Sequence, residues 1–291
     1  MGAFHPESPE RLRAINKMVS NIDWGGMLSL VDAPLLDVGD LESVHPSHHV
    51  DAILERSPQE GLAYLDADTA INPHSIDAAL HAAGAGILAT DMVLAGKAKN
   101  AFCAVRPPGH HAESTIAMGF CVFNSVALAV EHALASGLSR VAVLDFDVHH
   151  GNGTVEIFQN KPEVLVCSSF QYPFYPGRFD DVDLPNICLT PLREGTGSDV
   201  FRLAIERDWL PAIRTHQPEM FFISAGFDAH ADDPIGGLNL VDNDYLWITQ
   251  LLTEWADKYA QGRIVSMLEG GYNLDVLARS VKQHLRGLTE A

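Results

Sequence analysis

The chain has 291 residues, of which 47% are hydrophobic and 20% charged, with a formal net charge of −19. This composition excludes a disordered, collagen-like or coiled-coil chain. The acidity argues against nucleic acid and could attract basic substrates such as lysine-rich peptides or polyamines, although many proteins are simply acidic. The sequence contains no apolar run of about 18 residues, the length that a membrane span needs. The first twenty residues lack the apolar centre of a secretory signal. We therefore expect neither a membrane nor a nucleic acid partner, whereas a homo-oligomer is compatible with the sequence.

Short apolar runs rich in β-branched residues predict buried strands. They lie at residues 101–105, 141–146, 164–169, 220–226 and 263–268. Segments of helical length alternate with them, at residues 74–95, 122–136, 198–215, 242–260 and 274–285. This alternation predicts an α/β protein with a parallel sheet and helices on both faces. No repeat or change of composition marks a linker, so we expect one domain over residues 1–291.

The cysteines indicate a reducing compartment. The chain has four cysteines, scattered without a C-x-x-C pair: Cys103, Cys121, Cys167 and Cys188. The first three lie in apolar runs. We expect buried free thiols rather than disulfides, which predicts a cytoplasmic location.

Four of the predicted strands run into polar loops that contain glycine. The loops read RPPGHH, DVHHGNG, FDAH and GGYN, and they begin near residues 106, 147, 227 and 270. In an open parallel sheet the carboxyl ends of the strands share one edge, and ligands bind there. We therefore expect these four loops to form one functional site.

The segment LDFDVHHGNGT has the pattern of a metal site. Side chains alternate along an extended chain, so Asp145, Asp147 and His149 point the same way. Asp147 and His149 offer one oxygen and one nitrogen to a metal, and Asp228, after another strand, is the natural third ligand. Three ligands leave an open catalytic position, and this set suits Zn²⁺, although Fe²⁺ or Co²⁺ also fits. The alternative is that the aspartates cap helices and the histidines are structural.

His110 and His111 are candidates for proton transfer. A neutral imidazole takes a proton from water, and an imidazolium gives one to a leaving amine. Asp145 is the candidate carboxylate that would orient one of the rings. A second metal site is the alternative interpretation of the pair.

Three aromatic residues are candidates for the substrate pocket. Tyr272 follows Gly270 and Gly271, which let the backbone pass close to a ligand, and its phenol could stabilise a developing oxyanion. Phe120, after Gly119, and Phe170, at the end of another predicted strand, are candidates for opposite walls of a tunnel. Each of these aromatic residues could instead belong to the core.

Six motifs, in order along nearly the whole chain, resemble the histone deacetylase family. They are HPESPERL (5–12), RPPGHHA (106–112), GFCVFN (119–124), DFDVHHGNGT (145–154), SAGFDAHADDP (224–234) and EGGYN (269–273). The GNG and AGFDAHADDPIGG segments resemble its class II and bacterial amidohydrolase-like branch. The resemblance implies an arginase-like α/β/α fold with a mainly parallel eight-stranded sheet. Because the first motif starts at residue 5, the first strand of that sheet is expected to be absent or incomplete.

The family resemblance also implies roles for individual residues. Zinc would be held by Asp147, His149 and Asp228, and it would polarise an acetyl carbonyl together with Tyr272. Water would attack with help from His111, while Asp145 would hydrogen-bond His110. Asn152 would orient His111 without adding the charge that class I members place there with aspartate, so we expect His111 to be less basic.

A structural K⁺ ion and a substrate tunnel follow from the same resemblance. The K⁺ site would lie near residues 145–149 and Ser168, with Asp145, Asp147 and His149 contributing partly through backbone carbonyls. The tunnel would include Gly119, Phe120, Phe170, Ile235, Gly270 and Gly271.

The implied activity is zinc-dependent hydrolysis of acetyl-lysine side chains to acetate and free lysine. An acetylpolyamine amidohydrolase is the alternative with the same chemistry, and the acidic charge suits both substrates. A polyamine-selective family member has glutamate at the position that matches Ile235, so the apolar residue favours acyl-lysine. A dimanganese ureohydrolase would need further carboxylates, and Asn152 stands where one could lie. A non-enzymatic acyl-lysine binder would have no need of all three metal ligands, both histidines and Tyr272.

Overall fold

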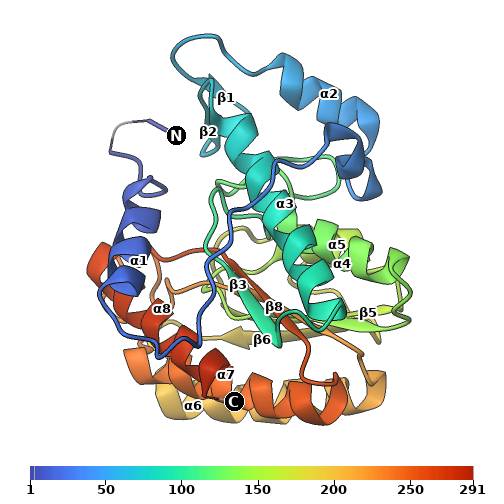
Figure 1. Ribbon diagram of the computed structural model, residues 1–291, viewed down its shortest axis with the longest axis vertical. Helices are drawn as coiled ribbons and strands as arrows, with labels where there is room; N and C mark the ends of the chain where they lie inside the picture. Colours follow the sequence, from blue (N-terminus) through green and yellow to red (C-terminus); the bar gives the residue numbers. More distant parts are fainter. Residues whose placement is uncertain (3, 291) are drawn as a thin grey trace.

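The computed structural model describes residues 1–2 and 4–290, and it has three layers built around a parallel sheet. The six strands of this sheet lie in the order β3-β8-β7-β4-β5-β6, and every neighbouring pair is parallel. Helices α3, α4 and α5 lie on one face of the sheet, and α6, α7 and α8 lie on the other (Figure 1). The predicted α/β/α fold is confirmed.

The strands occupy the predicted apolar runs, with one addition. They are β3 (Asn100–Cys103), β4 (Val141–Asp145), β5 (Val164–Gln171), β6 (Ile187–Leu192), β7 (Phe221–Ala225) and β8 (Ile264–Leu268). The sequence did not predict β6, an edge strand in which three residues are buried, two are partly buried and Pro191 is exposed. The described residues give this sheet six strands where eight were expected. Two further strands, β1 (Ala63–Tyr64) and β2 (Ala70–Ile71), pair only with each other, as an antiparallel hairpin.

The five predicted helices are present within a few residues of their expected ends. They are α3 (Ser75–Leu94), α4 (Ser125–Ala135), α6 (Ser198–His216), α7 (Asp242–Tyr259) and α8 (Leu274–Thr289). Asn124 and Asn273 cap α4 and α8, because each side chain accepts a hydrogen bond from a backbone N–H of the first turn. The structure adds α1 (Glu10–Ser20), the 3₁₀ helix η1 (Val38–Ser43), α2 (Ser47–Glu55) and α5 (Asn152–Phe158).

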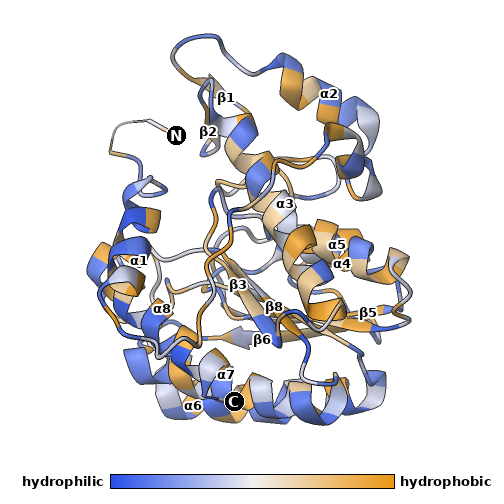
Figure 2. Ribbon diagram, viewed as in Figure 1, coloured by the Kyte–Doolittle hydropathy of each residue, from blue (hydrophilic) through white to orange (hydrophobic). Residues whose placement is uncertain are grey.

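The core consists of two apolar layers, one on each face of the sheet. Alternate strand residues supply them: Val141 and Val143 face the layer under α3 and α4, whereas Ala142 and Leu144 face the layer under α6 and α7. Figure 2 shows hydrophobic residues concentrated along the strands and along α4 and α5. Burial on both faces explains why the strands show no polar alternation in the sequence.

Helix α3 is long and apolar enough to cross a membrane by length and composition, and it is the one described helix with this property. The structure places 56% of its apolar window inside the protein. It packs against α4, β3 and β8 and contributes eleven buried residues. Packing against the sheet therefore accounts for its hydrophobic character.

Candidate active site

Asp147, His149 and Asp228 come together at the carboxyl edge of the sheet. The first two follow β4 and the third follows β7, the strand beside it. One potential ligand atom from each residue lies within 4.8 Å of the others, and all three side chains are buried. His149 Nδ1 lies 3.0 Å from Asp147 Oδ1 and 3.3 Å from Asp228 Oδ2. Among the described residues this is the one cluster of histidine, cysteine and acidic side chains that could hold a metal ion.

The surroundings of these three residues favour a bound cation. Asp228 Oδ1 accepts a hydrogen bond from the backbone N–H of Val148, whereas the buried Oδ2 has no hydrogen-bond partner. Burial alone would lower the pKa of His149, but the adjacent carboxylates outweigh it and raise that pKa to about 9. A buried, unpartnered carboxylate oxygen is costly, so these residues fit a divalent cation held by two carboxylates and one imidazole.

Gly270, which precedes Tyr272 in the loop after β8, lies directly against this cluster. Its backbone N–H donates to Asp147 Oδ2 over 2.8 Å. A Cβ atom at this position would lie 2.0 Å from Asp228 Oδ2. Only glycine therefore lets the loop approach both carboxylates this closely.

His110 belongs to a hydrogen-bonded pair with Asp145 beside the cluster. Its Nδ1 lies 2.8 Å from Asp145 Oδ2, and its Nε2 lies 3.9 Å from Asp147 Oδ1. Burial opposes a charge on the ring, yet Asp145 and the other nearby carboxylates raise the pKa of His110 well above its ordinary value. The surrounding carboxylates thus favour the protonated form of His110, and its partner Asp145 is the carboxylate that the sequence predicts.

His111 has the opposite electrostatic character. Its Nδ1 lies 2.7 Å from Oδ1 of Asn152, the first residue of α5. Burial, together with the charges of His110 and His149, lowers the pKa of His111 well below its ordinary value. The surroundings therefore favour the protonated form of His110 and the neutral form of His111, a combination that suits acid–base chemistry on one substrate.

The aromatic side chains around the site lie partly where they were predicted. Phe120 has a φ of 67°, an uncommon conformation for a bulky residue, and its ring packs edge-on against His5 at 4.7 Å and Tyr272 at 5.8 Å. Gly119 precedes it with a φ of 57°, and a Cβ there would lie 2.4 Å from His111 Cδ2. Gly119 and Phe120 are therefore close to both His111 and Tyr272.

The structure places Phe170 away from this group, contrary to the expectation that it forms the opposite wall. Strand β5 continues to Gln171, two residues beyond the predicted end, so Phe170 stays in the strand, 1% exposed, and packs on His150. The following loop supplies the aromatic contacts instead. Phe174 stacks on His149 with ring centroids 5.2 Å apart, and Tyr175 packs edge-on against His111, also at 5.2 Å.

Tyr272 and Ile235 are tied together by one buried carboxylate. Asp233 accepts hydrogen bonds from the backbone N–H groups of Tyr272 at 2.7 Å, Ile235 at 3.0 Å and Asn273 at 3.1 Å. Burial, with the charges of Asp228 and Asp147, raises the pKa of Tyr272 well above its ordinary value, so its phenol keeps its proton. Gly271, with a φ of 118°, forms the turn before Tyr272.

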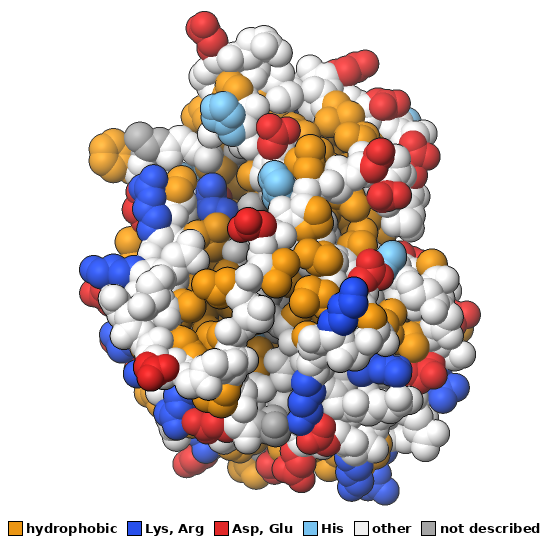
Figure 3. Space-filling model, viewed as in Figure 1, with side chains coloured by type: hydrophobic (Ala, Val, Ile, Leu, Met, Phe, Trp, Pro, Cys, Tyr) orange, Lys and Arg blue, Asp and Glu red, His pale blue; other side chains and the backbone are white. Residues whose placement is uncertain are grey.

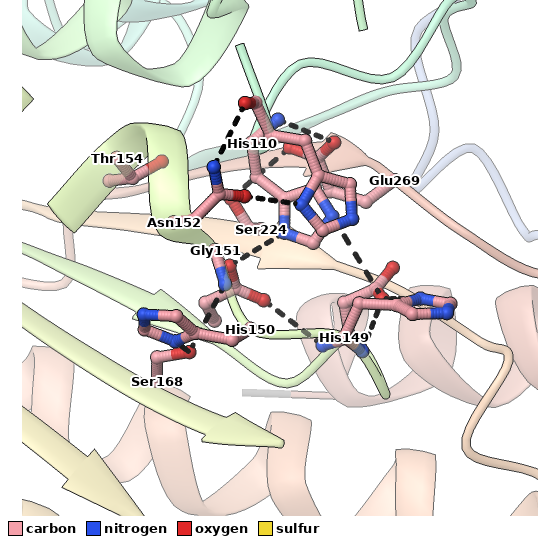
Figure 4. Close-up of polar contacts among 12 residues, drawn as sticks. His110, His149, His150, Gly151, Asn152, Thr154, Ser168, Ser224 and Glu269 are labelled. Atoms are coloured by element: carbon pink, nitrogen blue, oxygen red, sulfur yellow. Dashed lines mark hydrogen bonds and ion pairs between the residues drawn. The ribbon is translucent and has the colours of Figure 1, made fainter. Parts of the chain in front are cut away.

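Ser168, predicted near a K⁺ ion, lies beside the loop after β4 on the neighbouring strand β5. Its hydroxyl is 3.1 Å from His150 Nδ1 and 3.5 Å from the backbone nitrogen of Gly151 (Figure 4). The Asp145 carboxylate accepts the backbone N–H of Asp147 at 3.0 Å, which holds this loop in a tight turn.

Sequence reasoning missed several buried charged residues that hold the loops together. Glu269 accepts hydrogen bonds from the backbone N–H groups of Gly109 and His110, and burial raises its pKa to about 7. Arg11 donates to the backbone carbonyls of Glu269 and Gly271, and Glu7 forms a two-bond contact with Arg106. The signal was present, because these residues lie within the motifs EGGYN, HPESPERL and RPPGHHA.

Comparison with known proteins agrees with this geometry. The family model of the histone deacetylase domain matches residues 5–288. The chain is 39% identical over 279 residues to the histone deacetylase-like amidohydrolase of Pseudomonas aeruginosa, covering 93% of this chain and 73% of that protein. It is 35% identical to type-2 histone deacetylase 2 of Dictyostelium discoideum, with 99% of this chain aligned, but it spans only 20% of that longer protein. A crystal structure of the HDA15 HD domain superposes with a TM-score of 0.93 at 34% identity, covering all of this chain and 84% of that one.

The fold is of the arginase/deacetylase type, and the cluster of aspartate and histidine side chains could hold the metal ion that hydrolases of this type use. Within that class, the chain belongs to the histone deacetylase family.

Proposed function

We propose that this chain hydrolyses the amide of acyl-lysine side chains, acetyl-lysine first among them, and releases acetate and free lysine. The observation that carries the proposal is the convergence, on three buried potential metal ligands, of two adjacent histidines, one paired with the Asp145 carboxylate and the other with the Asn152 amide. These partners and the nearby charges favour opposite protonation states of the two rings. Amide hydrolysis needs a group that removes a proton from water and a group that supplies one to the leaving amine. His111 and His110 would be these two groups, and their ring centroids lie 4.0 Å apart.

Zinc is the proposed metal, held by Asp147, His149 and Asp228. A set of two carboxylates and one imidazole suits Zn²⁺, whereas Mg²⁺ and Ca²⁺ prefer oxygen ligands alone. When bound, zinc would act as a Lewis acid toward the acyl carbonyl and the attacking water. We also propose a structural K⁺ ion beside Ser168 and the loop of residues 145–149, as the family resemblance implies.

The chain's own residues would carry the remaining steps. His111, neutral and oriented by Asn152, would take the proton from the attacking water. His110, charged and paired with Asp145, would stabilise the negative charge that develops and hold a proton close to the leaving amine. Tyr272, whose phenol stays protonated, would donate a hydrogen bond to the developing oxyanion.

Metal analysis and two variants test this mechanism. We expect one zinc ion per chain, which Asp228→Ala should lose together with activity, as elemental analysis and a fluorogenic acetyl-lysine peptide would report. Tyr272→Phe should keep the metal and the fold but lose roughly 10²–10³ in kcat, the cost of one oxyanion donor. Full zinc occupancy in Asp228→Ala, or parental kcat in Tyr272→Phe, would contradict the assignments.

Ile235 supports acyl-lysine peptides over acetylpolyamines. The residue is partly exposed in the loop that carries Asp228, and a Cβ on the next residue, Gly236, would lie 2.1 Å from the Asp228 carbonyl oxygen. An apolar side chain here offers nothing to the second ammonium of a polyamine and leaves that charge partly desolvated. Acidic side chains also gather farther out, around α2 (Figure 3), where they suit a basic peptide.

Substrate competition separates the two activities. We expect the parental chain to have a higher kcat/KM for acetyl-lysine peptides than for acetylspermidine or acetylputrescine. Ile235→Glu should shift the ratio toward the polyamines, and Ile235→Gln, which adds similar bulk without charge, is the matched control. A parental preference for an acetylpolyamine would instead identify an acetylpolyamine amidohydrolase. We further propose a cytoplasmic location, which the four free cysteines support.

A further inference from the structure

A buried carboxylate lies directly behind the amide that orients His111. Glu113 is 3% exposed, and its Oε1 accepts a hydrogen bond from Asn152 Nδ2 at 2.7 Å. Arg178 approaches the same carboxylate with two N–H groups, at 2.7 Å and 2.8 Å. The four side chains therefore form a continuous chain, Arg178–Glu113–Asn152–His111, that runs from the half-exposed guanidinium to the ring beside the metal ligands.

The direction of each hydrogen bond in this chain follows from chemistry. A carboxylate can only accept, so it selects the orientation in which Asn152 turns its NH₂ group toward Glu113. The amide oxygen then faces His111 Nδ1 across 2.7 Å, and because this oxygen can only accept, Nδ1 must carry the proton. The lone pair of a neutral ring consequently lies on Nε2, the other nitrogen of the ring. Reversing the amide would set its oxygen against the Glu113 carboxylate.

We propose that Glu113 is a positioning residue that fixes the tautomer of His111 through the amide of Asn152, with Arg178 balancing the buried charge. The proposal rests on the proposed role of His111 as the group that takes a proton from water, because only the tautomer protonated at Nδ1 leaves Nε2 able to do so. From the sequence, Asn152 stands where class I members have aspartate, which removes a negative charge from this position. The structure shows that a negative charge is retained one side chain further from His111.

An exchange of the amide and the carboxylate tests this relay, the hydrogen-bonded series Arg178–Glu113–Asn152–His111. Asn152→Asp alone would bring two carboxylates into direct contact, and Glu113→Gln alone would remove the group that selects the amide orientation. Each single variant should lose about 10–100-fold in kcat, the usual cost of a lost supporting contact in such a site, with little change in KM. The double variant Glu113→Gln/Asn152→Asp restores every donor–acceptor pair, because the new amide at position 113 can donate to the new carboxylate at position 152, and that carboxylate can accept from His111. Its kcat should recover at least about 10-fold over either single variant.

Glu156→Gln is the matched control. Glu156 is a nearby carboxylate on α5 whose hydrogen bonds go to Ser114 and not to Asn152. This variant should keep the parental kcat. Thermal unfolding and zinc content, measured on every variant, confirm that the comparison is made between folded and loaded proteins. Parental kcat in Glu113→Gln, or a double variant no more active than the single ones, would overturn the proposal.

The tautomer can also be measured without any turnover. Nitrogen-15 NMR of histidine-labelled parental protein distinguishes a protonated from an unprotonated ring nitrogen, and the signals of His111 are assigned by their loss in His111→Gln. We expect His111 to be protonated at Nδ1 alone, with the opposite or a mixed tautomer in Glu113→Gln. A parental ring protonated at Nε2 would overturn the relay whatever the substrate is. A correct tautomer in a protein without deacylase activity would instead overturn only the proposed function.

Discussion

Replacing His284 should remove part of the acid sensitivity of the fold. This residue of α8 is fully buried between α7 and β8, with Nδ1 2.7 Å from Thr249 Oγ1 and Nε2 2.8 Å from Ser266 Oγ. The Thr249 hydroxyl donates to the carbonyl of Tyr245, so it accepts from His284 Nδ1. The neutral ring, which accepts from Ser266 at Nε2, therefore satisfies both of its polar contacts.

Burial lowers the pKa of His284 from 6.5 to about 3. The unfolded chain, in which the ring titrates near its ordinary value, therefore binds a proton first as the pH falls. The stability that the neutral ring contributes is complete above about pH 6.5 and declines from there toward pH 3. At about pH 4.5 the protein has passed through about two pH units of this window, so the contribution of this ring to stability has fallen by about 3 kcal/mol.

The assay is urea unfolding of the parental protein and His284→Gln at about pH 7 and about pH 4.5. His284→Gln should be less stable at neutral pH, but its loss between the two pH values should be smaller than the parental loss by about 3 kcal/mol. Leu285→Ala, a buried apolar truncation one residue away, is the control, and it should keep the parental pH dependence. Parallel declines of the parental protein and His284→Gln would refute the argument.

Two further substitutions test how the loops position the site. Gly119→Ala should retain the metal but lower kcat by about 10²-fold, because the new Cβ would displace the His111 ring and displacements near 1 Å have this cost; normal kcat with normal metal content would contradict the contact. Asp233→Ala should lower thermal stability and the affinity for acyl-lysine peptides together, because three backbone N–H groups, including those of Tyr272 and Ile235, lose their acceptor; an unchanged melting temperature and KM would count against this role.

The central strands were predictable because burial on both faces leaves a continuous apolar run in the sequence. Edge strand β6 lacks that signal, since it is only partly buried and Pro191 interrupts its apolar run. Helix α5 was missed for a different reason. It is seven residues long and begins with Asn152 and Gly153, which have low helix propensity, and packing against β5 holds it in place.

The candidate site was predictable where its residues follow strands, because topology alone brings those positions to one edge of the sheet. Residues that act through backbone groups of distant loops do not follow strands, so topology does not predict where they lie. Arg11 contacts Gly271, 260 positions away, and Glu113 gains its meaning only from the amide of Asn152. Phe170 lies within the sheet and not beyond it, because pairing with β6 extends β5 to Gln171, past the run of residues 164–169 from which the strand was predicted.

The last prediction concerns metal removal, and it follows from the buried carboxyl groups that gather at the site. Asp145, Asp147, Asp228 and Glu269 are each at most 1% exposed, and Asp228 Oδ2 has no hydrogen-bond partner. A metal bound only by the folded chain at about 1,000 times its dissociation constant adds about 4 kcal/mol to stability. At about 2–4 °C per kcal/mol for a chain near this size, chelation should lower the melting temperature by about 10 °C. Asp228→Ala should melt at the same temperature with and without chelator, because it has already lost the site. If the metal-free and the metal-loaded parental protein had the same melting temperature, the buried carboxylates would be balanced without a metal. The ligand assignment would then be wrong.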